Sequence, residues 1–518
     1  LRQVPPSSFL MTNYPKWLIP KRYPHIDLPC KGKRELLHLM SYVKTPDAIA
    51  KHAFSPLIRR NVITYPFKRQ NVKSPRKKDR KIRPITYASH TDSAIYGYYA
   101  LLLSSKYEKR LGEANLSDSV CAYRKIPCKE GNRHKCNIDI AKEVFEFIKD
   151  GLSEGHQLAA VTFDIKGFFD NLDHKLLKKA WKNVMGYEHM PDDVYNVFKS
   201  ITRYSYMNEK ALFQECKNHI ICQNVIGYKK RRVKRLSYLR DKGTVAFCDK
   251  SDIHHLRDFH LIQTRKKTDV QGIPQGLPIS AVLANVYMFD FDKKIKEEIC
   301  KTGGIYRRYS DDIIIVCPIN EGTKWKEYVC SEIKKLKLTI EPHKTNLFSF
   351  IPLHDKNVCS HEIVGEKKKL EYLGFSFDGN RILLKDAGLG KYYMKFDLNL
   401  RRTFYKSTHT NNKYWGSVFE NKLIKKFSYA GAKTHKKRIR SKTDKSKFDL
   451  SPNYRTHGNY LTYVRKASKI MDSPAIEWQL HRSVPKLRRR LIALKDSVDK
   501  VTKSRQVLEF FKYGKIYH

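Results

Sequence analysis

Two apolar segments, far apart in this sequence, end in acidic residues. Residues 158–164 (LAAVTFD) read as a buried strand that stops at Asp164. Residues 307–316 (RRYSDDIIIV) read as two strands joined by a two-residue turn at Ser310–Asp311, with Asp312 directly after the turn. The fold is therefore constrained to one in which strand ends present three carboxylates.

Adjacent carboxylates on a surface turn repel each other, so the pair of Asp311 and Asp312 is costly unless cations occupy it. Two Mg²⁺ ions about 3.5–4 Å apart would stabilise both the attacking and the leaving oxygen of an in-line phosphoryl transfer. Asp164 is the candidate for the third carboxylate, which would bridge the two ions. Taken alone, an Asp-Asp pair is most often a solvated turn, so the rest of the chain must decide.

The net charge of the chain is the second constraint. Of 518 residues, 102 are Lys or Arg and 52 are Asp or Glu, which gives a formal net charge of +50. Charge of one sign on this scale repels itself unless a partner neutralises it. Nucleic acid is therefore favoured as a partner over the alternative of a solvated basic surface. The densest basic patch lies at 228–242, and 433–447 is expected to be an exposed loop or linker because it has almost no apolar residue.

The length of the chain allows two to four structural units. Prolines crowd the first half of 1–60, so we expect this part to wrap over other elements as an extension. Strand-like and helical pieces alternate over 61–160, which indicates an α+β unit. Residues 205–268 are polar and basic and read as an insertion between core elements, and the pattern after 385 is helical, basic and rich in tyrosine.

Two local patterns predict helices around the acidic segments. Asp173 is the expected N-cap of a helix with the sequence HKLLKKAWKNVM. One helix is expected over 279–299, with Leu283, Tyr287 and Phe291 at four-residue spacing. No run of eighteen apolar residues and no signal-peptide pattern occurs, so we expect a cytoplasmic protein without a membrane partner.

Cysteines and histidines gather in the basic insertion, which raises the alternative of a structural zinc site. These residues are Cys216, His219, Cys222, Cys248, His254, His255 and His260. No CxxC pair is present among them, so ordinary thiols and surface histidines are favoured over zinc.

Six segments, in a fixed order, resemble the sequence motifs of reverse transcriptases. FDIKGFFDNLDH resembles their first palm motif, QGIPQGLPISAVLANVYM their second and RRYSDDIII their third. LKLTIEPHKT resembles the fourth motif, LEYLGF the primer-grip motif, and RKIRPITYAS, further upstream, the fingers motif. Six motifs in family order over residues 75–377 make coincidence negligible.

The resemblance implies an α+β fold of the right-hand polymerase type, in which fingers and a palm with an antiparallel sheet precede a helical, thumb-like C-terminal domain. The expected domains are the N-terminal extension at 1–60, fingers at 61–160, a palm at 161–384 that contains the insertion at 205–268, and the helical domain at 385–518.

The resemblance also implies roles for particular residues around the metals. Asp164, Asp311 and Asp312 would be catalytic metal ligands, and the Ile165 carbonyl an additional ligand, for two Mg²⁺ ions, with Mn²⁺ as a substitute. Lys344, in the fourth motif, would donate a proton to the departing pyrophosphate.

Further roles concern the nucleotide and the primer. Phe169 matches the aromatic steric gate that excludes a ribose 2′-hydroxyl, although Phe168 and Phe169 could both be core residues. Gln275 and Gly276 match the strip beside the incoming nucleotide, with plain turn residues as the alternative. The remaining candidates are Arg83 as the arginine that grips the triphosphate, Lys77, Lys78 or Lys81 as a second cation, and Tyr372, Leu373 and Gly374 as the primer-grip hairpin.

Within the family, the chain looks like a bacterial reverse transcriptase with a retron or group II-like core. VCAYRKI at 120–126, the long gap between the first and second motifs, and NYLTYVRKASKIM look closest to the defence-associated and abortive-infection enzymes. This resemblance implies an RNA-directed DNA polymerase that uses dNTPs, an RNA template and a DNA product in anti-phage defence. A dedicated non-coding RNA and a homo-oligomer are compatible with it.

Three alternatives stay open at this point. The first is a template-independent DNA polymerase primed on one of its own tyrosines, for which Tyr14, Tyr513 and Tyr517 are candidates because they lie near the chain ends. The second is an RNA-dependent RNA polymerase, disfavoured because Phe169 occupies the gate position. The third is a non-catalytic RNA-binding module, disfavoured because all three carboxylates are present.

Overall fold

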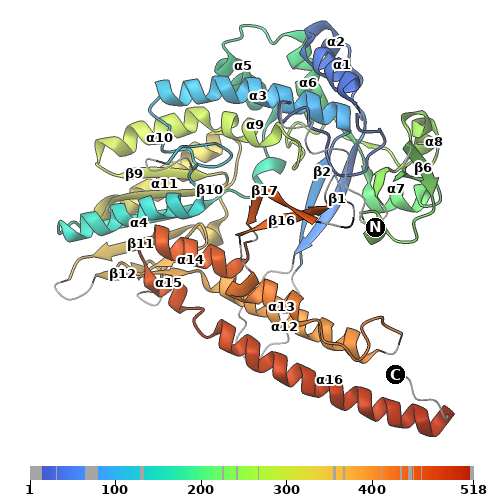
Figure 1. Ribbon diagram of the computed structural model, residues 1–518. Coiled ribbons are helices and arrows are strands. Elements are labelled where there is room, and N and C mark those ends of the chain that lie inside the picture. The colour runs from blue at the N-terminus through green and yellow to red at the C-terminus, as the bar shows by residue number, and fades with distance from the viewer. Residues whose placement is uncertain are drawn as a thin grey trace. The chain divides into compact units, whose positions relative to one another are not determined.

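The protein is described from a computed structural model, in which helices and strands are mixed, as the α+β expectation requires (Figure 1). The structure describes residues 14–30, 32–64, 80–128, 133–224, 227–240, 243–266, 268–353, 357–363, 365, 368–409, 411–431, 434–440, 446, 448–456 and 458–513. Contacts between residues divide the chain into two compact units. The first comprises 1–66, 76–126 and 159–347, and the second comprises 67–75, 127–158 and 348–518.

A four-stranded sheet in the first unit has the order β2-β1-β4-β8. Its strands are β1 (Leu57–Thr64), β2 (Lys81–Tyr87), β4 (Ser205–Asn208) and β8 (Gln263–Thr264). β1 runs antiparallel to β2 and parallel to β4, and β4 is antiparallel to β8. The segment predicted as an insertion therefore begins and ends on this sheet.

A second sheet carries the acidic strand ends. In the first unit its order is β3-β10-β9, and the strands are β3 (Leu158–Asp164), β9 (Ile305–Tyr309) and β10 (Asp312–Pro318). Of β11 (Asn346–Ile351), only the first two residues belong to this unit. β3 and β10 are almost continuously buried, as their apolar sequences require. The predicted strand at 158–164 and the predicted hairpin are both confirmed.

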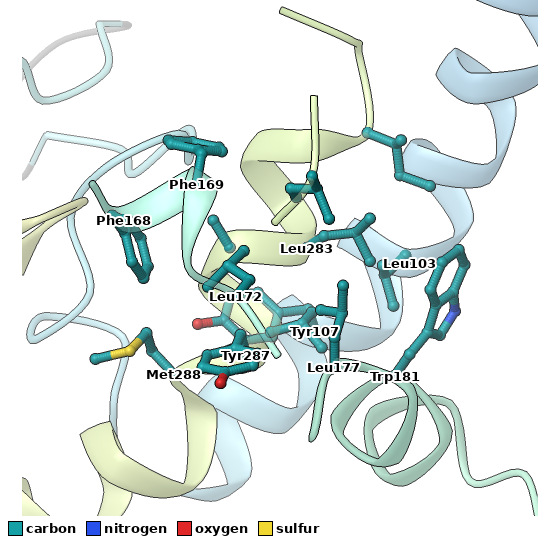
Figure 2. Packing of buried hydrophobic residues seen from close by; sticks show 14 of the residues in the cluster. Leu103, Tyr107, Phe168, Phe169, Leu172, Leu177, Trp181, Leu283, Tyr287 and Met288 are labelled. Carbon is teal, nitrogen blue, oxygen red and sulfur yellow. The ribbon is translucent and has the colours of Figure 1, made fainter. Parts of the chain in front are cut away.

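Helices pack with this sheet around the main core of the first unit. They are α3 (His90–Glu113), α5 (His174–Met185), α6 (Asp192–Thr202), α9 (Ser280–Tyr287), α10 (Phe289–Lys301) and α11 (Gly322–Lys335). Figure 2 shows part of this core, where Leu172, Leu283 and Tyr287 lie between Trp181 and the short helix that carries Phe168 and Phe169. The predicted N-cap is also present, because the Asp173 side chain accepts a hydrogen bond from the backbone N–H of Leu176 at 3.0 Å.

One predicted helix is broken in two. The expectation of a single helix over 279–299 is wrong, because α9 ends and α10 begins at Met288, whose φ and ψ are −89° and −2°. Asp290 and Asp292 lie in the first turn of α10, where carboxylates stabilise a helix N-terminus. The predicted apolar face survives the break: Leu283, Tyr287 and Phe291 are all buried.

The described N-terminal residues pack over both cores of the first unit. Trp17 and Leu18 join the main core, and the Trp17 Cβ lies where a side chain at Gly97 would have to go, 2.8 Å away. Two short helices follow, α1 (Lys33–Lys44) and α2 (Pro46–Ala50).

The predicted insertion folds around a small core of its own. Its elements are α7 (Glu209–Cys216), β5 (Ile220–Asn224), β6 (Gly227–Arg231), β7 (Thr244–Ala246) and α8 (Ile253–Asp258), with a sheet of order β6-β5-β7. Leu212, Phe213 and Phe247 fill the core together with Ile26 and Ile58, which come from outside the segment. The described part of the basic patch, 228–240, thus lies on a folded lobe, whose β6 residues Lys229 to Arg231 are exposed.

The second unit contains one helix from the middle of the chain, the rest of β11 and most of the C-terminal third. Its further elements are α4 (Asn137–Ser153), β12 (Val358–His361), β13 (Leu370–Tyr372), β14 (Phe375–Phe377), β15 (Ile382–Leu384), α12 (Asp386–Thr408), α13 (Glu420–Phe427), β16 (Thr434–Arg440), β17 (Phe448–Thr456), α14 (Tyr460–Ile470), α15 (Pro474–Trp478) and α16 (Ser483–Tyr513). The helical pattern expected after 385 is confirmed, with one exception.

The exception is the segment predicted as a loop or linker at 433–447. Its described residues 434–440 form β16, which pairs with β17 in an antiparallel hairpin. Strand pairing satisfies backbone groups without burying apolar side chains, so the polar composition did not exclude a strand. Among the residues that the structure describes, no helix is long and apolar enough to cross a membrane.

Candidate active site

The end of β3 and the turn between β9 and β10 lie next to each other. The backbone N–H of Ile165 donates a hydrogen bond to the Asp311 carbonyl at 3.2 Å, which places Asp164 and Asp311 on neighbouring strand ends. Asp312 pairs with Tyr309, so Ser310 and Asp311 form the predicted two-residue turn. The structure therefore brings all three predicted acidic residues to one edge of the sheet.

Lys344 meets the same edge from another element. It ends a short 3₁₀ helix (Pro342–Lys344), and its ammonium lies 2.7 Å from Oδ2 of Asp164. The position of this helix is fixed by the backbone, because Glu341 N–H donates to the Asp164 carbonyl at 2.8 Å. The Asp164 side chain is 19% exposed and that of Lys344 is 52% exposed, so water screens the pair only in part.

The carboxylates fit divalent metal ions by their chemistry, because Mg²⁺ prefers oxygen ligands and carboxylates above all. Their side chains are not gathered into a coordinating group, and the part of the chain that the structure describes holds no set of three His, Cys, Asp or Glu residues arranged for a metal ion. The Asp164 carboxylate is instead neutralised by Lys344. The predicted ligand role of the Ile165 carbonyl stays a prediction.

A buried ion pair lies directly behind the turn. Arg308 and Asp292 have 0% exposed side chains, and two hydrogen bonds of 2.7 and 2.5 Å run from the guanidinium to the two carboxylate oxygens. Burial alone would lower the pKa of Arg308, but the Asp292 carboxylate outweighs it and raises that pKa above the usual arginine value. The guanidinium therefore stays charged inside the core.

Sequence reasoning missed Arg308, Asp292 and their neighbour Tyr123. The only available signal for Arg308 was alternation along the strand, since buried Tyr306 and Arg308 share one face of β9. Alternation alone could not predict that Arg308 faces inward, because arginine is rarely fully buried without a paired carboxylate, and the strand sequence does not show one. Its partner Asp292 lies on a helix, sixteen residues earlier.

Phe169 lies in the wall of the main core. It belongs to a short 3₁₀ helix (Phe168–Asp170), is 9% exposed, and its ring meets that of Phe168 at 64° with centroids 5.7 Å apart. The two rings leave this helix in different directions (Figure 2). Phe168, at 3% exposure, is the more deeply buried of the two, and the gate role of Phe169 stays a prediction.

The loop that carries Gln275 and Gly276 is fixed to β2, the strand of the predicted fingers motif. Thr86 N–H donates to the Gln275 carbonyl at 2.8 Å, and a Cβ at Gly276 would lie 2.4 Å from the Thr86 carbonyl oxygen. Gly276 has a φ of +114°, which L side chains rarely adopt. The glycine is thus required by the backbone, which explains its presence without any ligand.

The predicted cations of the fingers motif lie on the exposed part of β2. Lys81 and Arg83 are both exposed, and Arg83 is opposite Val62 of β1. Their roles stay predictions. Lys77 and Lys78 lie outside the described residues, as does Tyr517 among the tyrosines considered for priming.

The predicted primer-grip residues form a tight hairpin in the second unit. β13 and β14 are joined by Leu373 and Gly374, both with positive φ, +45° and +95°. Asn137 of α4 donates from its side-chain amide to the Leu373 carbonyl at 3.1 Å, which holds the turn. The hairpin is confirmed, and its contact with a primer stays a prediction.

The cysteines of the insertion belong to its core. Cys216, Cys222 and Cys248 are buried there. The hydrogen bond between Cys216 and Cys248 raises the pKa of Cys248, as burial does, and lowers the pKa of Cys216.

Comparison with known proteins gives one family match. Residues 193–377 match the family described as reverse transcriptase (RNA-dependent DNA polymerase), which supports the prediction of an RNA-directed DNA polymerase. This span contains the second to fourth motifs and the primer-grip motif, but begins after Asp164. A comparison with curated protein sequences finds no match.

The solved structures that resemble this chain include two fungal telomerases. Apo telomerase from Candida tropicalis is 11% identical, with a TM-score of 0.36 over 87% of this chain and 63% of that one. Telomerase from Candida albicans, solved in complex with a TWJ fragment of telomeric RNA, is 12% identical, with a TM-score of 0.35 over 92% of this chain and 66% of that one. This chain therefore spans less than two thirds of either telomerase, and a likeness of this degree carries no argument about activity.

Proposed function

We propose that this protein is an RNA-directed DNA polymerase that adds dNTPs to a DNA strand by two-metal phosphoryl transfer. The observation that carries the proposal is the meeting of Asp164 with the Ser310–Asp311 turn at one sheet edge, joined by the hydrogen bond from Ile165 to Asp311. The family match over residues 193–377 supports the same activity.

Asp164, Asp311 and Asp312 would hold two divalent ions, Mg²⁺ or in its place Mn²⁺. Bound there, such ions would stabilise the negative charge on the attacking and leaving oxygens during phosphoryl transfer. The Lys344 ammonium already supplies one positive charge at this edge, 2.7 Å from the Asp164 carboxylate.

Lys344 carries a proton close to the reacting edge. Its side chain is half exposed and is held by a single ion pair, so it can turn from Asp164 toward a departing pyrophosphate. Donating a proton to that group would complete the step as a general acid. Lys344 thus serves in turn as counter-charge and as acid.

The nucleotide would lie between the carboxylates and the loop that is fixed to β2. Gly276 allows the backbone of this loop to approach closely, and Lys81 and Arg83 present cations for a triphosphate. Phe169, at the edge of the core, would meet the sugar at its 2′ position.

The substrates and setting follow from charge and motif likeness. A net charge of +50 suits an RNA template with its DNA product, with or without a dedicated non-coding RNA. The arrangement into fingers, palm and thumb, a cytoplasmic site of action and a role in bacterial anti-phage defence are part of this proposal, and rest on the six motifs and on VCAYRKI at 120–126.

The decisive experiment is primer extension with an RNA template, dNTPs and Mg²⁺. Asp311→Asn should reduce incorporation by about a thousandfold or more, since several kcal/mol of transition-state stabilisation is removed with one ligand charge. Asp192→Asn is the matched control, because this exposed residue in the first turn of α6 has the same chemistry away from the site. Incorporation by Asp311→Asn within tenfold of wild type would overturn the proposed function.

A further inference from the structure

The turn that carries Asp311 is supported by a segment from a distant part of the chain. Residues 119–121 run beside the end of β9: Arg308 N–H donates to the Ser119 carbonyl at 2.7 Å, and Cys121 N–H donates to the Arg308 carbonyl at 2.9 Å. Two residues further on, Tyr123 reaches the turn itself. Its hydroxyl lies 3.1 Å from the hydroxyl of Ser310.

Both partners of this hydrogen bond have a backbone conformation that is rare for residues with a side chain. The φ angles of Tyr123 and Ser310 are +63° and +62°, and the described residues include only five other non-glycine residues with positive φ. Such conformations persist only where the surroundings impose them, and they cluster at functional sites. Here two of them contact each other beside the carboxylates.

Ser310 is held from a second direction by the buried ion pair. Nη1 of Arg308 donates to the Ser310 carbonyl at 3.2 Å and to the Asn285 side-chain carbonyl at 3.1 Å. Asn285 in turn donates to the carbonyl of Ala122, the residue before Tyr123. The same network thus fixes both Ser310 and the backbone that presents the tyrosine.

The Tyr123 side chain is not part of the buried core. It is 52% exposed, whereas the Ser310 side chain that its hydroxyl meets is buried at 5% exposure, so loss of the tyrosine hydroxyl takes a partner from Ser310 without burying an unpaired atom of the tyrosine itself. The effect of Tyr123 is therefore local to the turn at Ser310.

We propose that Tyr123 is a positioning residue that keeps Ser310 in its left-handed conformation. Tyr123 does so through a hydrogen bond with the Ser310 hydroxyl, while Arg308 donates to the Ser310 carbonyl. Ser310 precedes Asp311 and Asp312 directly, so its φ angle decides where both carboxylates point. This inference rests on the proposed polymerase function for its consequence, but its structural content is independent of that function.

The test compares Tyr123→Phe, Ser310→Ala and the double variant with wild type. Each single variant should lower kcat about fivefold, the size of one net hydrogen bond, raise the Mg²⁺ concentration needed for half-maximal rate, and leave the KM for dNTP unchanged. The double variant should be no worse than either single variant, because all three lack the same bond.

Tyr96→Phe is the matched control. Tyr96 also donates to a serine hydroxyl, that of Ser200 at 3.0 Å, but it does so from the core, where it is 1% exposed. We expect this control to lose stability and keep its kcat, and Tyr123→Phe to lose more kcat than its loss of stability explains. Additive losses in the double variant, or a fall in kcat that only follows a fall in stability, would overturn the proposal.

Hydrogen exchange of the metal-free protein provides a readout that does not depend on activity. Tyr123→Phe should speed exchange in a peptide covering 305–318 and leave a peptide covering β3 unchanged. Unchanged exchange in the turn peptide refutes the positioning role. If wild type itself fails to incorporate dNTPs, the proposed function fails, and the exchange experiment still decides whether Tyr123 holds the turn.

Discussion

Replacement of Gly276 by alanine tests how the nucleotide loop is joined to β2. Two penalties are expected in Gly276→Ala. A φ of +114° lies in a region that alanine rarely adopts, at a cost of about 1–3 kcal/mol. The new Cβ would also lie 2.4 Å from the Thr86 carbonyl oxygen, so the loop must move away from the strand.

That movement strains the hydrogen bond from Thr86 N–H to the Gln275 carbonyl, worth about 1 kcal/mol net. Together the two penalties predict a loss of about 2–4 kcal/mol in the free energy of unfolding. Gly186→Ala is the matched control, because Gly186 also has a positive φ, +75°, but has open space where a Cβ would go. The control should lose only about 1–2 kcal/mol, the cost of the left-handed conformation alone.

Urea unfolding of the two variants measures the difference. In primer extension, Gly276→Ala should also raise the KM for dNTP, since the displaced loop would no longer lie beside the cations of β2, whereas Gly186→Ala should not. A stability loss in Gly276→Ala that equals the loss in Gly186→Ala would refute the reasoning, because it would mean that the close approach to Thr86 carries no cost.

Phe169→Ala should admit ribonucleotides, because the ring opposes a 2′-hydroxyl at a cost of about 1–3 kcal/mol. Single-nucleotide incorporation measures the preference for dNTP over rNTP, and an unchanged preference would assign Phe169 to the core alone. Binding to labelled RNA should weaken about a thousandfold or more between about 50 and 200 mM salt if about six to ten phosphates are contacted, and a flat response in fluorescence anisotropy would contradict a basic interface. Stability should be highest above about pH 6.5 and fall below it, because burial lowers the pKa of His25 to about 3 and that of His90 to about 4, so that only the unfolded chain takes up these protons. At about pH 5.5, each histidine lowers the free energy of unfolding by about 1.4 kcal/mol relative to about pH 7.5. Asp27 restores about 1 kcal/mol, because burial raises its pKa to about 6 and the folded chain then takes up its proton more readily than the unfolded chain. Equal free energies of unfolding at about pH 7.5 and 5.5 would refute this reasoning.

Features governed by neighbouring residues could be predicted from the sequence. The turn at Ser310–Asp311 follows from an apolar strand on one side and acidic residues at the tip, and the cap at Asp173 follows from its position before a helical pattern. The end of β3 at Asp164 is equally local. The order of these segments then sufficed to suggest a common site.

Features that depend on distant partners could not be predicted in the same way. The break at Met288 sets the start of α10, whose Asp292 pairs with Arg308, and a 3.6-residue period shows nothing of such a break. Lys344 lies 180 positions from Asp164, and only the folded chain shows their ion pair. The hydrogen bond between Tyr123 and Ser310 joins residues 187 positions apart, without any periodic signal.

The insertion leaves and re-enters the four-stranded sheet across one pair of strands, since Ser205 of β4 is opposite Thr264 of β8. Lengthening a chain whose ends are already joined costs little, about 0.6 kcal/mol for each doubling, so this lobe can gain residues over evolutionary time with almost no penalty to the rest. Deleting the lobe would destabilise the rest of the fold, because Ile26 and Ile58, which lie outside the insertion, are buried in its core and would be exposed to water. Adding residues to this lobe should therefore cost little stability, whereas deleting it should cost much more.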